Sequence, residues 1–165
     1  MNAQPVNATL VSITIWLALI LYVITECGKT IRPASSRPST WLRAVWSLAC
    51  ASYLAHVITA FDLYHGWSHA AAYAHTAKQT HALLGLVWGG GIWLNYAFTI
   101  LWISEVAWWW MAPASYMGRQ RGLEYTVRGV FLFMIINGAV VFVDGPMRWV
   151  GVVMAAWLIR VWWTA

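Results

Sequence analysis

Five long apolar stretches divide the chain, and short polar or glycine- and proline-containing segments separate them. The stretches run over residues 9–25, 41–64, 86–111, 125–143 and 147–163. A helix needs about 20 apolar residues to cross the hydrocarbon core of a bilayer, so each stretch predicts one spanning helix. Only Asp144-Gly145-Pro146, which is typical of a tight turn, separates the last two stretches. The pattern therefore predicts an all-α integral membrane protein, a single domain over residues 1–165 with five transmembrane helices in a compact bundle.

The connection between the second and third stretches carries its own helix signal. Ser68 precedes the alanine-rich segment 69–78, and serine is a favoured N-cap residue while alanine is the best helix former. This segment is too polar to cross a bilayer. We therefore expect a short interfacial helix on the outer face of the membrane. By the same logic, Ser39 or Thr40 should cap the second spanning helix.

Composition excludes an ordinary soluble domain. The 165 residues are 61% hydrophobic and 9% charged, whereas soluble domains carry about 25% charged residues. A soluble fold of this size could not bury so much apolar surface. The net charge of +5 does not indicate a nucleic-acid partner, because the cations stand singly in short loops.

The distribution of lysine and arginine predicts the orientation of the helices. Cytoplasmic loops carry an excess of these residues. The cation-rich connections contain Lys29, Arg32, Arg37 and Arg43 in the first loop and Arg119 and Arg121 in the third. The second loop has only Lys78, and the last turn only Arg148. We therefore expect the N-terminus outside and the C-terminus inside, in a bacterial inner membrane.

All five histidines fall between residues 56 and 81, which the predicted orientation places in or near the outer half of the membrane. A b-type haem in a bundle takes axial histidines from facing helices. His56, His65 and His81 are therefore candidates for contact with haem b or quinone. Polar stripes on apolar helices face the bundle interior, and Ser52, His56 and Thr59 form such a stripe.

The segment His65-Gly66-Trp67-Ser68-His69 resembles the His-Gly-x-x-His patch of the cytochrome b anchor subunits of succinate dehydrogenase. The resemblance covers five residues, and no residue role is carried over from it. Among the fourteen tryptophans, most lie near the predicted helix ends and are typical of an interfacial aromatic belt. The deeper Trp93 and Trp102 are candidates for stacking on a pigment or quinone.

A divalent metal is a second interpretation of the histidines. His65 and His69 are four residues apart, which places both rings on one face of a helix. Together with His75 they offer nitrogen ligands suited to copper or zinc. A third interpretation is a solvated, histidine-rich loop without a ligand.

A buried ion pair between Glu105 and Arg128 is also predicted. Both residues lie inside apolar stretches near the same, inner end, where a lone charge would be costly. Glu26 is the alternative partner of Arg128.

The chain has almost no mass outside the membrane, so we expect no independent catalytic activity. The leading hypothesis is an accessory or anchor subunit of an electron-transfer complex, in contact with lipid and with other membrane subunits or further copies of itself. The alternatives are an outer-face copper- or zinc-binding membrane protein and a purely structural subunit.

Overall fold

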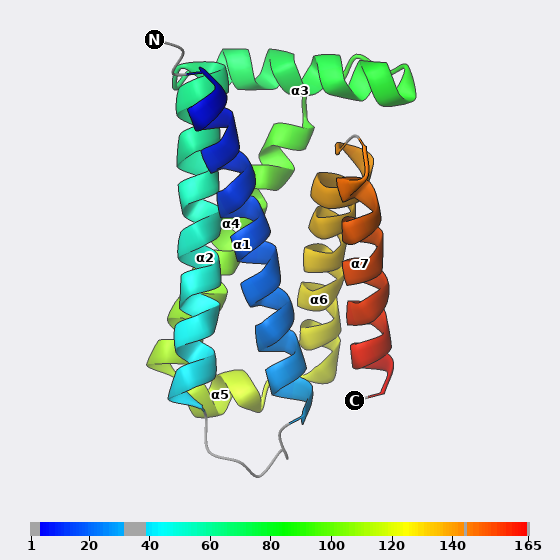
Figure 1. Cartoon of the computed structure of the whole chain (residues 1–165). Helices are drawn as coiled ribbons and strands as arrows, with labels where there is room; N and C mark the ends of the chain where they lie inside the picture. The colour runs from blue at the N-terminus through cyan, green and yellow to red at the C-terminus, as the bar shows by residue number, and fades with distance from the viewer. Residues whose placement is uncertain (1–3, 32–38, 144, 165) are drawn as a thin grey trace.

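The computed structural model describes residues 4–31, 39–143 and 145–164, and these residues form helices and no strand. The helices are α1 (Gln4–Ile31), α2 (Thr40–Ala60), α3 (His69–Leu84), α4 (Gly91–Met111), α5 (Pro113–Met117), α6 (Arg121–Ile136) and α7 (Met147–Trp163), with π-helical turns η1 (Phe61–His65) and η2 (Asn137–Val141). Figure 1 shows α1, α2, α4, α6 and α7 side by side along one axis, with α3 across one end and α5 at the other. The all-α fold is thereby confirmed.

Three helical stretches are long and apolar enough to cross a membrane, namely Thr9–Ile31, Thr40–His65 and Arg121–Val141. They coincide with the first, second and fourth predicted stretches. The fifth stretch has the same bounds as α7, and the third stretch begins before α4, which starts at Gly91. That α4 and α7 cross a membrane stays a prediction. Residues 32–38 and Asp144 lie outside the described residues. They include Arg32 and Arg37 of the first loop and the first residue of the predicted Asp144-Gly145-Pro146 turn.

Local turn chemistry sets α3 across the end of the bundle. Gly66 and Trp67 both have positive φ, 51° and 59°, and end η1. The Trp67 indole N–H donates to Asp62 at 3.0 Å, which anchors this turn. Ser68 then caps α3 as predicted, because its hydroxyl oxygen accepts from the Ala71 N–H at 3.2 Å. Ser39 caps α2 in the same way.

A layer of buried aromatic rings crosses the middle of the bundle. Tyr22 of α1 stacks on Phe131 of α6 with centroids 4.8 Å apart, and Tyr53 of α2 stacks on Trp102 of α4 at 5.2 Å. Trp46 contacts both Tyr22 and Trp102. Because large rings bury much apolar area, this layer joins four of the long helices at their centre.

The last helix packs closely on η2 at one glycine. A Cβ atom at Gly151 of α7 would overlap the backbone carbonyl of Ala139. Gly151 is buried, and α7 also contacts α1. The absence of a side chain at this position therefore sets how closely α7 approaches the bundle.

We expect Gly151→Ala to lower the free energy of unfolding by about 1–3 kcal/mol, because overpacking forces helices apart. Gly122→Ala in α6 is the matched control, since a Cβ there meets open space. Unfolding by SDS in mixed micelles, followed by circular dichroism, measures both variants. Equal stability of Gly151→Ala and the parent protein would contradict the close α7–η2 contact.

Candidate functional site

A cavity of about 470 Å³ lies inside the bundle, in the half nearest α3. Residues of α1, α2, η1, α4, α6 and η2 line it, together with Met147 at the start of α7. Binding pockets for small molecules have volumes of about 300–1,000 Å³ and mostly apolar walls with a few polar groups. The cavity has these properties and is the strongest candidate site among the described residues.

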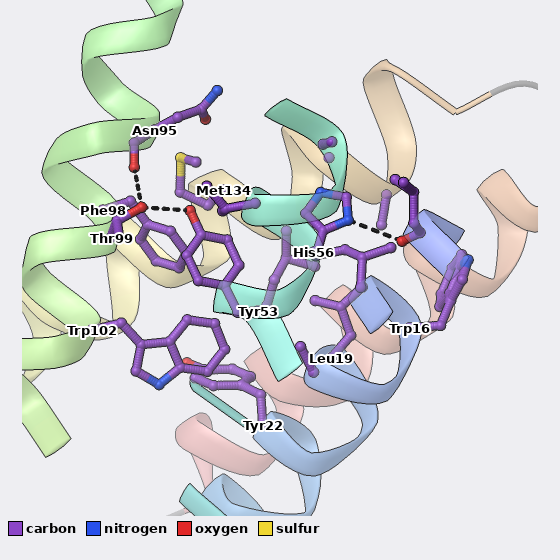
Figure 2. Close-up of a pocket in the computed structure, with 18 of the residues that line it drawn as sticks. Trp16, Leu19, Tyr22, Tyr53, His56, Asn95, Phe98, Thr99, Trp102 and Met134 are labelled. Carbon is purple, nitrogen blue, oxygen red and sulfur yellow. Dashed lines mark hydrogen bonds between the residues drawn. The ribbon is translucent and has the colours of Figure 1, made fainter. Parts of the chain in front are cut away.

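Flat aromatic rings form the inner boundary of the cavity. Tyr22, Tyr53, Phe98, Trp102 and Phe131 all line it, and they belong to the aromatic layer at the centre of the bundle. Figure 2 shows Tyr53, Trp102 and Tyr22 close together on one side of this space. Tyr22 stacks on Phe131 and Tyr53 stacks on Trp102. The rings therefore close this end of the cavity with an apolar surface, which suits the ring of an apolar ligand.

His56 of α2 provides the clearest polar group in the cavity. Its Nδ1 lies 2.9 Å from the backbone carbonyl oxygen of Val11 in α1, as Figure 2 shows. A carbonyl oxygen can only accept, so Nδ1 carries the proton. In the neutral imidazole, Nε2 is then an acceptor. The contact with α1 holds the ring in place and determines which nitrogen is left for a ligand.

A second polar group joins α2 and α4. The Thr99 hydroxyl donates to the Asn95 carbonyl at 2.8 Å, so at 3.1 Å it accepts from the Tyr53 hydroxyl. Figure 2 shows these two contacts in sequence. The Tyr53 oxygen keeps lone pairs that can accept a hydrogen bond. Asn95 also lines the cavity, and its side-chain amide has both donor and acceptor atoms.

The structure brings together two of the three histidines proposed for haem or quinone. His56 and His65 line the same cavity, whereas His81 is exposed on α3 and does not. His56 and His65 are nine residues apart on one continuous helical stretch, or about 13 Å along its axis. They cannot bind one iron from opposite sides. No other histidine of the described chain lines the cavity, so the residues present do not fit a bis-histidine haem.

The proposed metal set is also divided. His65 and His75 lie close together, with ring centroids 5.2 Å apart. His69 instead contacts Tyr96, with Nδ1 2.9 Å from the hydroxyl. The turn at Gly66 and Trp67 interrupts the helix between His65 and His69. The two rings therefore do not lie on one face of a helix, although the residues are four positions apart. In the part of the chain that the structure describes, no three His, Cys, Asp or Glu residues gather closely enough for a metal ion.

The predicted ion pair between Glu105 and Arg128 does not form, which corrects the sequence analysis. Glu105 binds Arg119 at 2.7 Å, because α5 turns the chain back toward the end of α4. Arg128 instead binds Glu26 at 3.2 Å and Glu124 at 2.8 Å. Its contact with Glu26 is the alternative that the sequence analysis named.

These contacts belong to a continuous polar chain at the α5 end of the bundle. Lys29 donates to Glu26 at 2.8 Å and to the Tyr116 hydroxyl at 3.2 Å. Tyr116 donates to Glu105 at 3.0 Å. Burial raises the pKa of the Tyr116 phenol, against the opposing effect of the Lys29 charge. The phenol therefore keeps its proton at neutral pH and can donate to Glu105.

Rings surround the ammonium group of Lys29. It lies 4.2 Å from the centroid of Trp46 and 4.9 Å from that of Trp109, which are favourable cation–π distances. Sequence analysis placed Lys29 and Arg119 among loop cations and did not consider Tyr116. The three-residue spacing of Glu26 and Lys29 in an apolar helix was the available signal for Lys29.

No protein-family model, curated protein or solved structure matches the chain.

We expect Glu26→Gln to lower the free energy of unfolding by about 3–5 kcal/mol, because it leaves buried cations without their counter-charge. Glu26 is 3% exposed and accepts from Lys29, Arg128 and Trp162. Glu124→Gln is the matched control. Its side chain also binds Arg128 but is 32% exposed, so a loss of only about 0.3–0.5 kcal/mol is expected. Unfolding in SDS mixed micelles measures both, and equal losses would contradict the importance of the buried contacts.

Proposed function

We propose that the chain is a bacterial inner-membrane subunit that crosses the bilayer five times, through α1, α2 with η1, α4, α6 with η2, and α7. The three long apolar helices support the first, second and fourth crossings. For α4 and α7 the support is their length of 21 and 17 residues and their position beside the other three (Figure 1). Their exposed large side chains include Leu94, Ile100, Ile103, Val150, Val153 and Ile159. Such residues suit contact with lipid chains.

The charged residues support an orientation with the α5 end in the cytoplasm. Four cations lie near that end, in the last turn of α1, the first turn of α2, the segment after α5 and the start of α6, namely Lys29, Arg43, Arg119 and Arg121. Lys78 is on α3, at the opposite end. By the positive-inside rule, α3 and the half of the bundle that contains the cavity are then on the outer side.

We expect an impermeant maleimide to label Lys78→Cys in intact spheroplasts and to label Arg121→Cys only after permeabilisation. Both positions are exposed, and both substitutions are made in a Cys27→Ala, Cys50→Ala background. The native cysteines are free thiols, so removing them eliminates background labelling. The reverse labelling pattern would contradict the orientation, and labelling of both sites from outside would contradict the number of crossings.

We further propose that the cavity binds the ring of a quinone, and that the protein is an accessory or anchor subunit of a membrane electron-transfer complex. The observation that carries this proposal is an apolar cavity that combines flat aromatic walls with the oriented imidazole of His56. The hydroxyls of a quinol can donate to His56 Nε2 and to the Tyr53 oxygen. The carbonyls of the oxidised ring can accept from the Asn95 amide. One small set of side chains thus suits both redox forms.

Gly138→Leu should weaken binding of a tail-less benzoquinone by about tenfold or more, because the new side chain occupies part of the cavity. Gly138 lines the cavity, and a Cβ there meets no atom within 4 Å, so the bundle itself should tolerate the change. Filling part of a ligand site with a leucine side chain reduces the binding free energy by about 1–3 kcal/mol, which lowers the affinity by up to roughly a hundredfold. Gly122→Leu, on the same helix but away from the cavity, is the control. Quenching of tryptophan fluorescence in nanodiscs measures binding, since Trp16 and Trp102 line the cavity.

Two results would overturn the quinone proposal. The first is a wild-type protein that shows no saturable quenching with either the oxidised or the reduced probe. The second is a Soret band in the absorption spectrum of the purified protein that disappears in His56→Leu, which would assign the cavity to haem. Retention of a native quinone in organic extracts of the purified wild-type protein, with its loss in Gly138→Leu, would support the proposal.

A further inference from the structure

A second apolar depression lies between α4 and α6. Leu94 and Leu101 of α4 line one side, and Gly129 and Phe133 of α6 line the other. We call it the α4–α6 groove. Leu94 and Phe133 are 45% and 50% exposed, so the groove opens to the outside of the bundle. In the proposed membrane arrangement, this outer surface of the bundle faces the lipid chains.

The α4–α6 groove and the cavity share part of their lining. Phe98 and Met134 line both of them. In Figure 2 these two side chains lie at the α4 side of the cavity, while His56 lies at the α1 side. Methionine has a flexible, unbranched side chain that adapts to different neighbours. Two side chains, one of them adaptable, therefore stand between the interior of the bundle and the groove.

The groove suits a hydrocarbon chain. Its lining carries no ionisable side chain, and its one hydroxyl, that of Thr126, donates to the backbone oxygen of Gly122 at 2.9 Å. At Gly129 a Cβ would meet nothing within 4 Å, so this residue leaves a gap in the face of α6. α4 and α6 also contact each other over only a short part of their length.

We propose that the α4–α6 groove holds the hydrocarbon tail of a lipid-soluble quinone whose ring lies in the cavity. The ligand enters sideways from the bilayer, between α4 and α6, and its chain passes Phe98 and Met134. This inference rests on the proposed function of the cavity and adds the class of ligand, a flat ring with a long isoprenoid chain. The wall that the two spaces share, formed by Phe98 and Met134, favours one ligand that reaches both spaces over a separate lipid or a second helix.

Gly129→Leu tests the groove. The probes are a tail-less benzoquinone and the same ring with an isoprenoid tail, both at known mole fractions in nanodiscs. Gly129→Leu should leave binding of the tail-less probe unchanged and weaken binding of the tailed probe by about tenfold, because its side chain fills the groove. Gly129→Ala should give a smaller effect in the same direction. Unchanged binding of the tail-less probe also shows that the variant is folded.

A photoreactive tail provides an independent measurement. A diazirine on the isoprene unit nearest the ring should crosslink to peptides from residues 94–101 and 126–134, as identified by mass spectrometry. Crosslinks confined to α1 or α7 would overturn the inference, as would an unchanged ratio of tailed to tail-less affinity in Gly129→Leu. A diazirine-labelled phospholipid that crosslinks in the groove and is not displaced by the tailed quinone would assign the groove to bilayer lipid.

The two proposals fail in different ways. A wild-type protein that binds neither probe would overturn the quinone function of the cavity and the groove inference with it. A wild type that binds both probes, with Gly138→Leu weakening both and Gly129→Leu weakening neither, would overturn the groove inference alone.

Discussion

The need to neutralise buried charge constrains this bundle more than any other interaction. Glu26 and Glu105 are 3% and 4% exposed, and an unpaired charge in an apolar interior is very costly. Each carboxylate therefore requires cations, and these come from different parts of the chain. Glu26 takes Lys29 of its own helix and Arg128 of α6, while Glu105 of α4 takes Arg119 from beyond α5. Trp162 of α7 donates to Glu26 as well, so the polar chain joins four long helices at one end.

This constraint explains why the two halves of the bundle differ. At the α5 end, charge pairs and the rings around Lys29 fill the space between helices. The aromatic layer, with Tyr22 stacked on Phe131, then fills the middle. Toward α3 the described residues are joined by uncharged hydrogen bonds, such as those of His56 and Tyr53, and Gly138 leaves room. The cavity thus lies in the half of the bundle where uncharged contacts replace the buried charge pairs.

Local patterns predicted the fold better than they predicted the site. Hydrophobic runs and the serine caps at Ser39 and Ser68 depend on near neighbours in sequence, so the all-α fold and the start of α3 could be predicted. The Glu105–Arg128 pair could not be judged from sequence, because the path of the chain through α5 decides which arginine returns to Glu105. His81 points elsewhere because positive φ angles at Gly66 and Trp67 set the direction of α3. His56, His65 and Trp102 were candidates from the sequence and line the cavity, but most of its walls are apolar residues from five helices whose local spacing does not mark them.

Several polar groups of the cavity have partners in the protein, although the indole N–H of Trp102, another lining residue, has none among the described residues. The partnered groups bear on how a ligand could bind. Nδ1 of His56 donates to the Val11 carbonyl, and the Tyr53 hydroxyl donates to Thr99, whose own proton goes to the Asn95 carbonyl. The donors of His56, Tyr53 and Thr99 are thus satisfied by α1 or α4 before any ligand arrives, so these three groups need no reorganisation on binding. What remains available on these three groups is acceptor capacity, at Nε2 of His56 and at the Tyr53 oxygen. A quinol hydroxyl would add a hydrogen bond without breaking one, and a ligand that offers only acceptors would find its donor at the Asn95 amide.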